Sequence, residues 1–244
     1  MADATFRPVA RRTWARRVRR WTMYLMVGWL VLTVGTVLLF RFVDPPTSMF
    51  IMADRVAAMT GDESYPLRHQ WVSWPDISGN VKIAVIAAED QKFPDHHGFD
   101  FESIQDALED RERGGPQRGA STISQQVAKN LFLWADSNWV RKGLEVYFTV
   151  LIEVCWSKQR ILEVYLNMAE FGRGVFGVGA ASGHFYDKAA ASLTQEQAAR
   201  LAAVLPSPKH YSVAKPGRYV QRRTKRIQKQ MRRLGGTGFL QRLK

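Results

Sequence analysis

A glutamate at the end of an apolar run is the first residue whose type and position suit chemistry. Residues 83–88 are Ile-Ala-Val-Ile-Ala-Ala, and we expect Glu89 at the carboxyl end of a helix over residues 81–90. Poor solvation raises the pKa of a carboxyl group, and the negative end of the helix dipole disfavours its ionised form. Both effects favour a general base that works near neutral pH. An exposed glutamate at a helix end is an equal alternative from this pattern alone.

The residues after Glu89 include acids and histidines, but their spacing does not indicate a metal site. His96 and His97 are adjacent, whereas the histidines of a zinc-binding helix are four residues apart. The sequence therefore requires no metal or other cofactor.

A polar helix face is expected shortly after a glycine-rich loop. Ser121 or Thr122 is positioned to cap a helix that continues to about residue 134. Side-chain amides beside an ammonium group suit the hydroxyls of a sugar and the oxygens of a phosphate. The alternative is a solvated face, although such a face usually has more acids and fewer glutamines. The polar residues, paired one turn apart, are Gln125 with Lys129 and Gln126 with Asn130.

A charged pair and a single cysteine come later in the chain. Arg141 and Glu145 lie one helical turn apart, and a surface ion pair is the commoner meaning of that spacing. Cys155 has no partner for an internal disulfide and lies in an apolar run, so we expect a small core residue.

Helical patterns joined by Gly and Pro are expected to position these residues. Asp100 is expected to cap one helix, and residues 194–197 have the capping-box spacing before an alanine-rich helix that ends at Pro206. Residues 171–179 are expected to form a glycine-rich loop, and no alternating pattern predicts a strand. A C-terminal helix with Lys and Arg on its remaining faces ends at Gly235. Its apolar stripe is Val220, Ile227, Met231 and Leu234. The other expected helices cover residues 101–113, 139–156 and 158–170.

An uncharged stretch near the N-terminus is long enough to cross a membrane. Residues 21–40 contain no charge, and about 20 apolar residues span the hydrocarbon core. Seven arginines precede it, which predicts a cytoplasmic tail over 1–20, a transmembrane helix over 21–43 and an extracytoplasmic domain over 44–244. A cleaved signal peptide is the less favoured alternative, because its apolar region is usually shorter.

The basic residues are concentrated at the ends of the chain. The formal net charge is +13, and residues 209–244 contain twelve Lys or Arg and no Asp or Glu. This distribution suits contact with an anionic membrane surface or with phosphates. Nucleic-acid binding and a non-enzymatic basic membrane protein are the alternatives. Neither explains a set of acids, amides and cations before residue 146, and no nucleic-acid recognition motif is present.

Four segments in order closely resemble the monofunctional peptidoglycan glycosyltransferases, or biosynthetic transglycosylases. This family is related to the glycosyltransferase domain of class A penicillin-binding proteins. The resemblance runs from about residue 74 to 236. Two departures are Gly179, where the family often has Glu, and Phe185-Tyr186, where it often has Tyr-Phe. The four segments are Glu89-Asp90-x-x-Phe93-x-x-His96-x-Gly98, Gly119-x-Ser121-Thr122-x-x-Gln125-Gln126-x-x-Lys129-Asn130, Arg141-Lys142-x-x-Glu145 and Tyr165-Leu166-Asn167.

The resemblance implies a mainly α, lysozyme-like, two-lobed glycosyltransferase domain after the membrane helix. It implies an inverting enzyme without a transpeptidase domain. This enzyme polymerises lipid II, a disaccharide-pentapeptide on undecaprenyl diphosphate, into β-1,4 glycan strands and releases undecaprenyl diphosphate. Glu89 corresponds to the catalytic base and Glu145 to the second acid, while Lys129 and Arg141 correspond to groups that hold the diphosphate. The remaining substrate-binding residues implied are Asp90, Phe93, His96, Ser121, Thr122, Gln125, Gln126, Asn130 and Lys142.

The resemblance also implies a setting for the enzyme. Lipid II, the growing glycan strand, membrane lipids and proteins of cell-wall synthesis or division are the expected partners, without nucleic acid. A divalent cation, Mg or Mn, assists some members of the family. The expected location is the bacterial inner membrane, with the catalytic domain in the periplasm. A lytic, lysozyme-like glycan hydrolase is the main alternative, because it also needs an acid in a sugar groove. Such a hydrolase has no use for diphosphate-binding cations.

Overall fold

The computed structural model describes residues 10–61, 65–114, 119, 121–136 and 138–243; side chains are not described for 10–13 and 108. The chain forms two compact units, Met1–Val43 and Asp44–Lys244. In the first unit, helix α1 (Ala10–Phe42) includes a segment, Trp14–Phe42, that is long and apolar enough to cross a membrane. The helix therefore begins before the predicted span. Residues 1–9 of the predicted tail lie outside the described residues.

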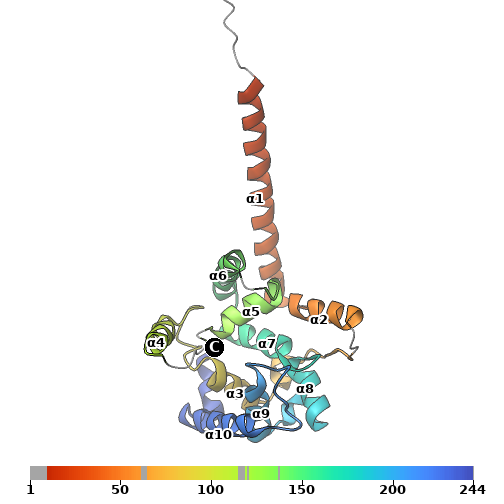
Figure 1. Ribbon diagram of the computed structural model, residues 1–244, viewed down its shortest axis with the longest axis vertical. Helices are drawn as coiled ribbons and strands as arrows, with labels where there is room; N and C mark the ends of the chain where they lie inside the picture. Colours follow the sequence, from red (N-terminus) through yellow and green to blue (C-terminus); the bar gives the residue numbers. More distant parts are fainter. Residues whose placement is uncertain (1–9, 62–64, 115–118, 120, 137, 244) are drawn as a thin grey trace, which may run out of the picture. The chain divides into compact units, whose positions relative to one another are not determined.

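The second unit consists mainly of helices (Figure 1). Each helix expected there is present, and its ends lie within a few residues of the predicted ones. The α-helices are α2 (Met49–Thr60), α3 (Gly79–Glu89), α4 (Phe101–Glu112), α5 (Ile123–Phe132), α6 (Trp139–Cys155), α7 (Lys158–Met168), α8 (Gly177–Tyr186), α9 (Gln195–Val204) and α10 (Arg218–Arg233). Short 3-10 helices are η1 (Trp74–Asp76), η2 (Ala190–Ser192) and η3 (Gly236–Leu243).

Side-chain caps explain where several helices begin. Asp100 accepts a hydrogen bond from the backbone N–H of Ser103 at 3.0 Å, as expected for the start of α4. Thr122, rather than Ser121, caps α5, and Gln125 completes a capping box there. Thr194 forms the predicted capping box at α9. These local bonds satisfy the free N–H groups of a first helical turn and fix where each helix starts.

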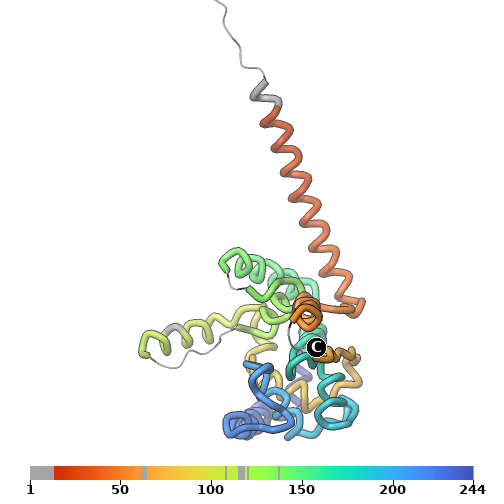
Figure 2. Tube along the Cα trace, turned by 45° about the vertical axis from the view of Figure 1, so that its right-hand side comes forward, coloured from red at the N-terminus to blue at the C-terminus, as the bar shows by residue number. Residues whose placement is uncertain are grey.

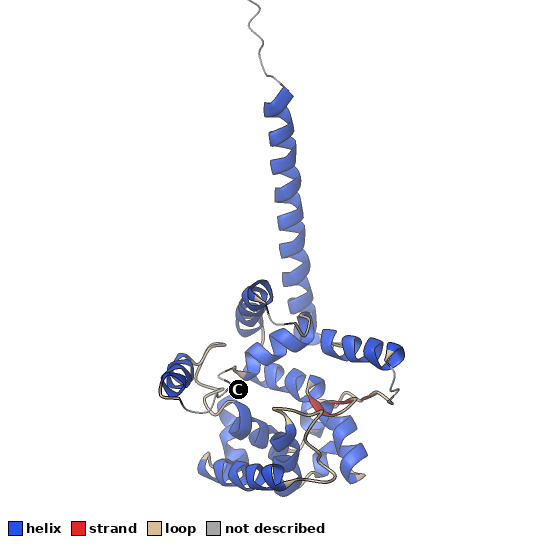
Figure 3. Ribbon diagram, in the orientation of Figure 1, coloured by secondary structure: helices blue, strands red, loops and turns tan. Residues whose placement is uncertain are grey.

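The structure contains three short strands that no alternating pattern in the sequence predicted. Strands β1 (Arg68–His69), β2 (Glu170–Gly172) and β3 (Val175–Phe176) form a small sheet in the order β1-β3-β2 (Figure 3). β1 pairs with β3 in parallel, and β2 pairs with β3 antiparallel. Part of the predicted 171–179 loop is therefore a hairpin followed by the first turn of α8. Strands of two or three residues are too short to show an alternating pattern, so no sequence pattern predicted them.

Asn167 ties the segment before η1 to the helical core. Its side-chain oxygen accepts from Val72 N at 2.7 Å, and its amide donates to Val72 O at 2.9 Å and Glu163 O at 2.9 Å. The side chain is fully buried, and both its oxygen and its NH₂ group form hydrogen bonds. It thus bonds the backbone N–H and C=O of Val72 as a neighbouring strand would. This role explains an asparagine at the end of the Tyr-Leu-Asn motif.

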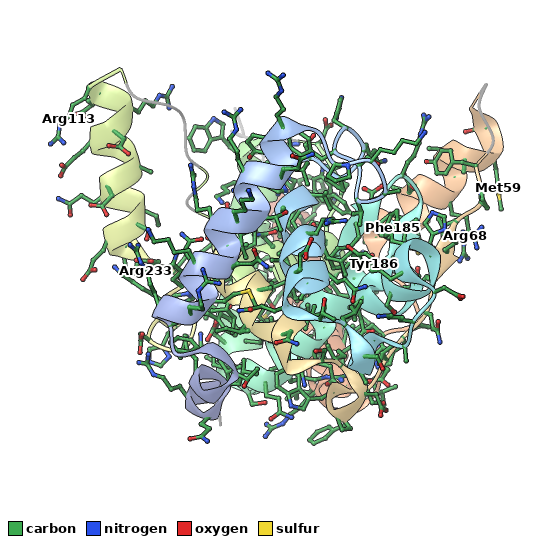
Figure 4. The ribbon with its side chains drawn as sticks, turned by 90° about the horizontal axis from the view of Figure 1, so that it is seen from below. Met59, Arg68, Arg113, Phe185, Tyr186 and Arg233 are labelled. Carbon is green, nitrogen blue, oxygen red and sulfur yellow. The ribbon has the colours of Figure 1, made fainter. Side chains whose placement is uncertain are left out.

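The two departures from the family pattern lie on α8. A Cβ at Gly179 would lie 2.6 Å from Gln70 O and 2.5 Å from Val72 Cγ2, so no side chain fits while residues 70–72 run here. Phe185 packs over Gly172, whose added Cβ would lie 2.9 Å from the ring. Burial raises the pKa of Tyr186 to about 12. Figure 4 labels Phe185 and Tyr186 near the carboxyl end of α8. Both departures therefore concern packing of α8 against the small sheet.

The core is arranged around two central helices. α3 lies against α9 and α10, and α5 lies against α6 and α7 (Figures 1 and 2). Seven of the eleven residues of α3 are buried, and they form the uninterrupted run 81–87. A helix that is apolar on all sides must be enclosed by the rest of the protein. Its last residue, Glu89, therefore lies at the edge of the core and not on the open surface.

Candidate active site

Glu89 lies at the carboxyl end of α3 with its side chain 14% exposed. One carboxylate oxygen accepts a hydrogen bond from Gln126 Nε2 at 3.2 Å, and the other accepts from Arg223 Nη2 at 3.2 Å. Tyr165 Oη donates to Gln126 Oε1 at 3.2 Å and so fixes which end of the amide faces the glutamate. The acid is thus held by one amide and one guanidinium.

The electrostatic balance at Glu89 favours the protonated form. Burial raises the pKa of the Glu89 carboxyl above its ordinary value, while the hydrogen bond from Gln126 and the charge of Arg223 partly lower it. The net direction is upward, which favours the desolvated acid over the exposed glutamate, the two alternatives that the sequence left equal. A carboxylate whose pKa moves toward neutrality is a better proton acceptor for a hydroxyl group.

Arg223 is a site residue that the sequence analysis missed. It belongs to α10 and lies 134 positions after Glu89, so no local spacing connects the two. The only sequence signal was its place beside the apolar stripe of α10, next to Thr224 rather than on the outer basic face. An arginine at that border has a side chain that can reach into the fold.

Asp90 and His96 form a buried network that positions the start of α5. The backbone N–H of Gly98 donates to His96 Nδ1 at 3.1 Å, so the ring proton is on Nε2. Nε2 lies 3.0 Å from each carboxylate oxygen of Asp90 and donates to that carboxylate. Asp90 also accepts from Ile123 N at 2.9 Å. Thr122 Oγ1 donates to Gly98 O at 2.7 Å and closes the network. The side chains of Asp90 and His96 are 3% and 8% exposed, which suits positioning rather than direct contact with a substrate.

Gly98 must be a glycine for this network to form. Its φ of +91° is a left-handed conformation that side chains disfavour. A Cβ at this position would also lie 2.8 Å from Thr149 Cγ2 on α6. The loop after α3 therefore packs closely against α6. This contact connects the helix that carries Glu89 with the helix that carries Glu145.

Lys129 lies on α5 and interacts electrostatically with both candidate acids. Burial lowers the pKa of its ammonium group, while the negative charges of Glu145 and Glu89 partly raise it. The group also lies 5.6 Å from the ring of Phe50 on α2. A partly desolvated cation interacts more strongly with an anion than a fully hydrated one does.

Glu145 has a different environment from Glu89. Its side chain is 4% exposed, and its two oxygens accept from Arg141 Nη1 at 2.7 Å and Lys142 Nζ at 2.5 Å. Arg141 is itself buried, so the pair predicted from spacing is not a surface ion pair. Asn138 caps α6 by accepting from Arg141 N at 2.8 Å. Arg141 Nε is buried and has no hydrogen-bond partner in the described part of the chain.

The remaining predicted residues fall into two groups. Phe93 is fully buried, and Gln125 is almost fully buried within its capping box, so both support the fold around the site. Ser121 is exposed beside a cleft, and Asn130 Oδ1 is buried without a partner among the described residues. The structure therefore brings the amides and cations of α5 and α6 together with Glu89, but it does not present Phe93 or Gln125 to a ligand.

A cleft of about 310 Å³ opens beside Glu89. Both polar and apolar residues line it, and four of its five charged side chains are acids: Glu89, Asp90, Asp100 and Asp106, beside Lys92. Hydroxyl-rich ligands suit such a wall because carboxylates accept hydrogen bonds from hydroxyl groups. The cleft has room for part of a sugar chain with Glu89 at one end.

The residues present do not form an evident site for a divalent cation. Among the described residues, no three His, Cys, Asp or Glu side chains are grouped in a way that could hold a metal ion. Both oxygens of Glu145 already accept hydrogen bonds from cationic side chains. We therefore derive no step of the chemistry through a metal.

Comparison with known protein families shows which family has this sequence. A model of the transglycosylase family matches residues 55–232, which include every candidate site residue. The chain belongs to the transglycosylase family. It is a peptidoglycan glycosyltransferase of cell-wall synthesis with a mainly helical, lysozyme-like domain, as its sequence predicted.

Close relatives of this transglycosylase cover nearly the whole chain. A protein of Chromohalobacter salexigens is 51% identical over 232 residues, which are 95% of this chain and 99% of the relative. One from Xanthomonas axonopodis pv. citri is 53% identical over 230 residues, 93% of this chain and 94% of the relative. One from Pseudomonas fluorescens is 50% identical over 228 residues, 93% of each chain. All three are described as biosynthetic peptidoglycan transglycosylases. The family acts on lipid II and glycan strands.

Proposed function

We propose that Glu89 is the general base of lipid II polymerisation and that Lys129, Arg141 and Lys142 bind the diphosphate of the donor. The observation that carries the proposal is the pairing of two unlike regions. A partly buried carboxylate with a raised pKa lies on one side, and a cluster of three cations lies on the other. Lys129 interacts electrostatically with both acids.

The proposed reaction is a single displacement at the anomeric carbon of the donor. The Glu89 carboxylate takes the proton of an acceptor sugar hydroxyl, and the hydroxyl oxygen attacks the anomeric carbon of the donor from the side opposite the diphosphate. The new glycosidic bond forms as the bond between carbon and phosphate oxygen breaks, with inversion at that carbon. Glu89 keeps the proton until it exchanges with water. A diphosphate is stable as an anion, so it needs charge stabilisation rather than a proton donor.

Glu145 serves this step indirectly. Its carboxylate holds Arg141 and Lys142 at the start of α6 and limits the freedom of both long side chains. Fixed donors stabilise developing charge without the cost of reorganising at the moment of reaction. The unpaired Nε of Arg141 is a further donor for a phosphate oxygen.

The orientation of the chain is part of the same proposal. The seven arginines before residue 21 favour a cytoplasmic N-terminus in the inner membrane, with Asp44–Lys244 in the periplasm. A reporter that is active only outside the cytoplasm, fused after Lys244, is then active. Activity of only a cytoplasmic reporter contradicts the orientation.

Exposed apolar side chains support contact of the second unit with membrane lipids. Met49, Met52, Val56 and Met59 form a stripe along one side of α2, with Met59 77% exposed. Trp139 at the start of α6 is 91% exposed. Both helices contribute to the region around the cation cluster, so a lipid-linked donor can keep its chain in the bilayer while its diphosphate reaches Arg141. Proteins of cell-wall synthesis or division are proposed as additional partners.

Polymer formation from lipid II and cleavage of finished glycan, measured in parallel, separate the transferase from the hydrolase. The proposal expects polymer from wild type, no cleavage of lipid-free glycan, and strongly reduced polymer from Lys129→Ala. Robust glycan cleavage that is unaffected by Lys129→Ala, without polymer, contradicts it.

A further inference from the structure

The outer face of α10 is a strongly basic surface that the proposed reaction does not use. Seven Lys or Arg of this helix are exposed, and no ion pair joins any of them to an acid in the described part of the chain. At 3.6 residues per turn they fall within about 120° of the helix circumference. The helix itself contains no acid. So dense a row of unpaired cations repels itself unless an anion neutralises it.

The row passes close to the reaction centre. Arg223 of the same helix donates to Glu89, and Arg222 and Arg226 lie within one turn of it. From Arg218 to Arg233 the helix extends for about 22 Å, at 1.5 Å per residue. Figure 4 views the unit from the α10 side and labels Arg233 at the far end. A polymer that starts at Glu89 and follows α10 toward Arg233 therefore passes five of the seven exposed cations.

The structure argues against a lipid surface as the anion. The apolar stripe of α10 is used up in packing, because Val220, Ile227 and Met231 are each 2% exposed or less. A helix that lies in a membrane interface needs a free apolar face to insert. The exposed apolar residues of the unit lie instead on α2 and α6, and α10 lies at the opposite end of the unit from both (Figures 1 and 2).

We propose that the basic face of α10 binds the peptide carboxylates of the glycan strand that the enzyme produces. This inference rests on the proposed function, because the strand is its product. Each disaccharide of the product carries a peptide that ends in a carboxylate, so the strand is a regularly spaced polyanion. Exposed cations attract such a chain over several ångströms, and several weak contacts on one strand add through multivalency. The face keeps the product beside Glu89 between successive additions.

A binding assay tests this without requiring turnover. The full chain with Glu89→Gln is mixed with lipid-free glycan strands, either native or with their peptide carboxylates converted to carboxamides. In this background, Arg222→Gln, Arg226→Gln and Lys229→Gln together remove three adjacent cations. If each exposed charge contact contributes about a factor of two, affinity for native glycan falls on the order of eightfold. The carboxamide glycan binds the unaltered background with the same weakened affinity.

A matched control removes the same charge elsewhere. Arg55, Arg68 and Lys188 are three exposed cations outside α10. The triple variant Arg55→Gln, Arg68→Gln and Lys188→Gln is expected to keep its affinity for native glycan. Equal losses from both triple variants, or equal binding of native and carboxamide glycan, overturn the proposal. Vesicles rich in anionic lipid provide a further arm, and capture of such vesicles through the α10 cations also contradicts it.

The result can be separated from failure of the proposed function. Wild type that binds glycan through α10 but makes no polymer from lipid II refutes the reaction and leaves the surface intact. The opposite result is also distinguishable. If wild type makes polymer, and the α10 triple substitution changes neither strand length nor glycan binding, only the proposed role of the α10 face is refuted.

Discussion

The two glutamates of the candidate site have different surroundings, which suit them to the two different roles proposed for them. Glu89 ends an enclosed apolar helix and has one amide and one guanidinium as partners, and its pKa is raised. Glu145 is more deeply buried than Glu89 and has a cation on each oxygen. The raised pKa suits Glu89 to gain and lose a proton, and its two ion pairs suit Glu145 to hold two cations in place. Burial alone does not decide the role; the number of charged partners does.

Replacing Glu89 is expected to have the largest effect on catalysis. Glu89→Gln keeps the size of the side chain and can still accept from Arg223, but it cannot take a proton. General-base catalysis contributes about 10²–10⁴-fold, so we expect a loss of polymer formation of at least that order. Initial rates with lipid II check it, and circular dichroism shows that the fold is retained. Near-normal turnover contradicts the assignment.

The cation cluster is expected to come next. Lys129→Ala removes a preorganised group that stabilises the leaving diphosphate, which costs on the order of 10²–10³-fold in comparable sites. Arg141→Lys keeps the charge but loses the planar fork, so its rate falls between those of wild type and Arg141→Ala. Single-turnover rates on lipid II measure both. If both residues only decorate helix surfaces, each change has little effect.

The comparison also predicts opposite effects on stability. Glu145→Gln leaves the buried guanidinium of Arg141 without its anion, and loss of one partner of a buried pair costs about 3 kcal/mol. Glu89→Gln removes a carboxylate that burial disfavours, so at neutral pH the free energy of unfolding is unchanged or higher. Denaturant unfolding of the two variants is the measurement. Similar destabilisation by both substitutions removes the distinction drawn between the two acids.

A smaller effect is expected at Arg223, and it appears in the pH profile. The positive charge of Arg223 lowers the pKa of Glu89, so Arg223→Gln raises that pKa further. The base acts when ionised, and activity rises as pH increases through its pKa. The acid limb of the rate profile therefore moves to higher pH in Arg223→Gln, while the rate at high pH changes less. Arg222→Gln, one position away on the exposed face, is the control that leaves the limb in place.

Local spacing predicted the parts of the site that lie on one helix. The apolar run before Glu89 indicated a desolvated acid, and the separation of Arg141 and Glu145 indicated their pairing. The caps Asp100 and Thr194 were also predicted, because a cap is a bond between near neighbours.

Long-range pairing hid the remaining features. Arg223 reaches Glu89 from α10, and Asn167 bonds Val72 across 95 positions, and neither has a local signature. The small sheet joins residues 68–69 to a hairpin 100 positions later in strands too short for a pattern. Burial of Asp90 and His96 was equally hidden, because it depends on how α5 packs against the loop after α3.

The rate of lipid II polymerisation as a function of pH tests the contrast between the acids most directly. For wild type we predict a bell shape. The acid limb lies above the ordinary range of a glutamate, because Glu89 must be ionised, and the basic limb lies below that of an ordinary lysine, because Lys129 must be charged. In Glu145→Gln the acid limb remains while the rate falls, and in Glu89→Gln the acid limb is absent. An acid limb that persists in Glu89→Gln and disappears in Glu145→Gln would show that the two roles are reversed.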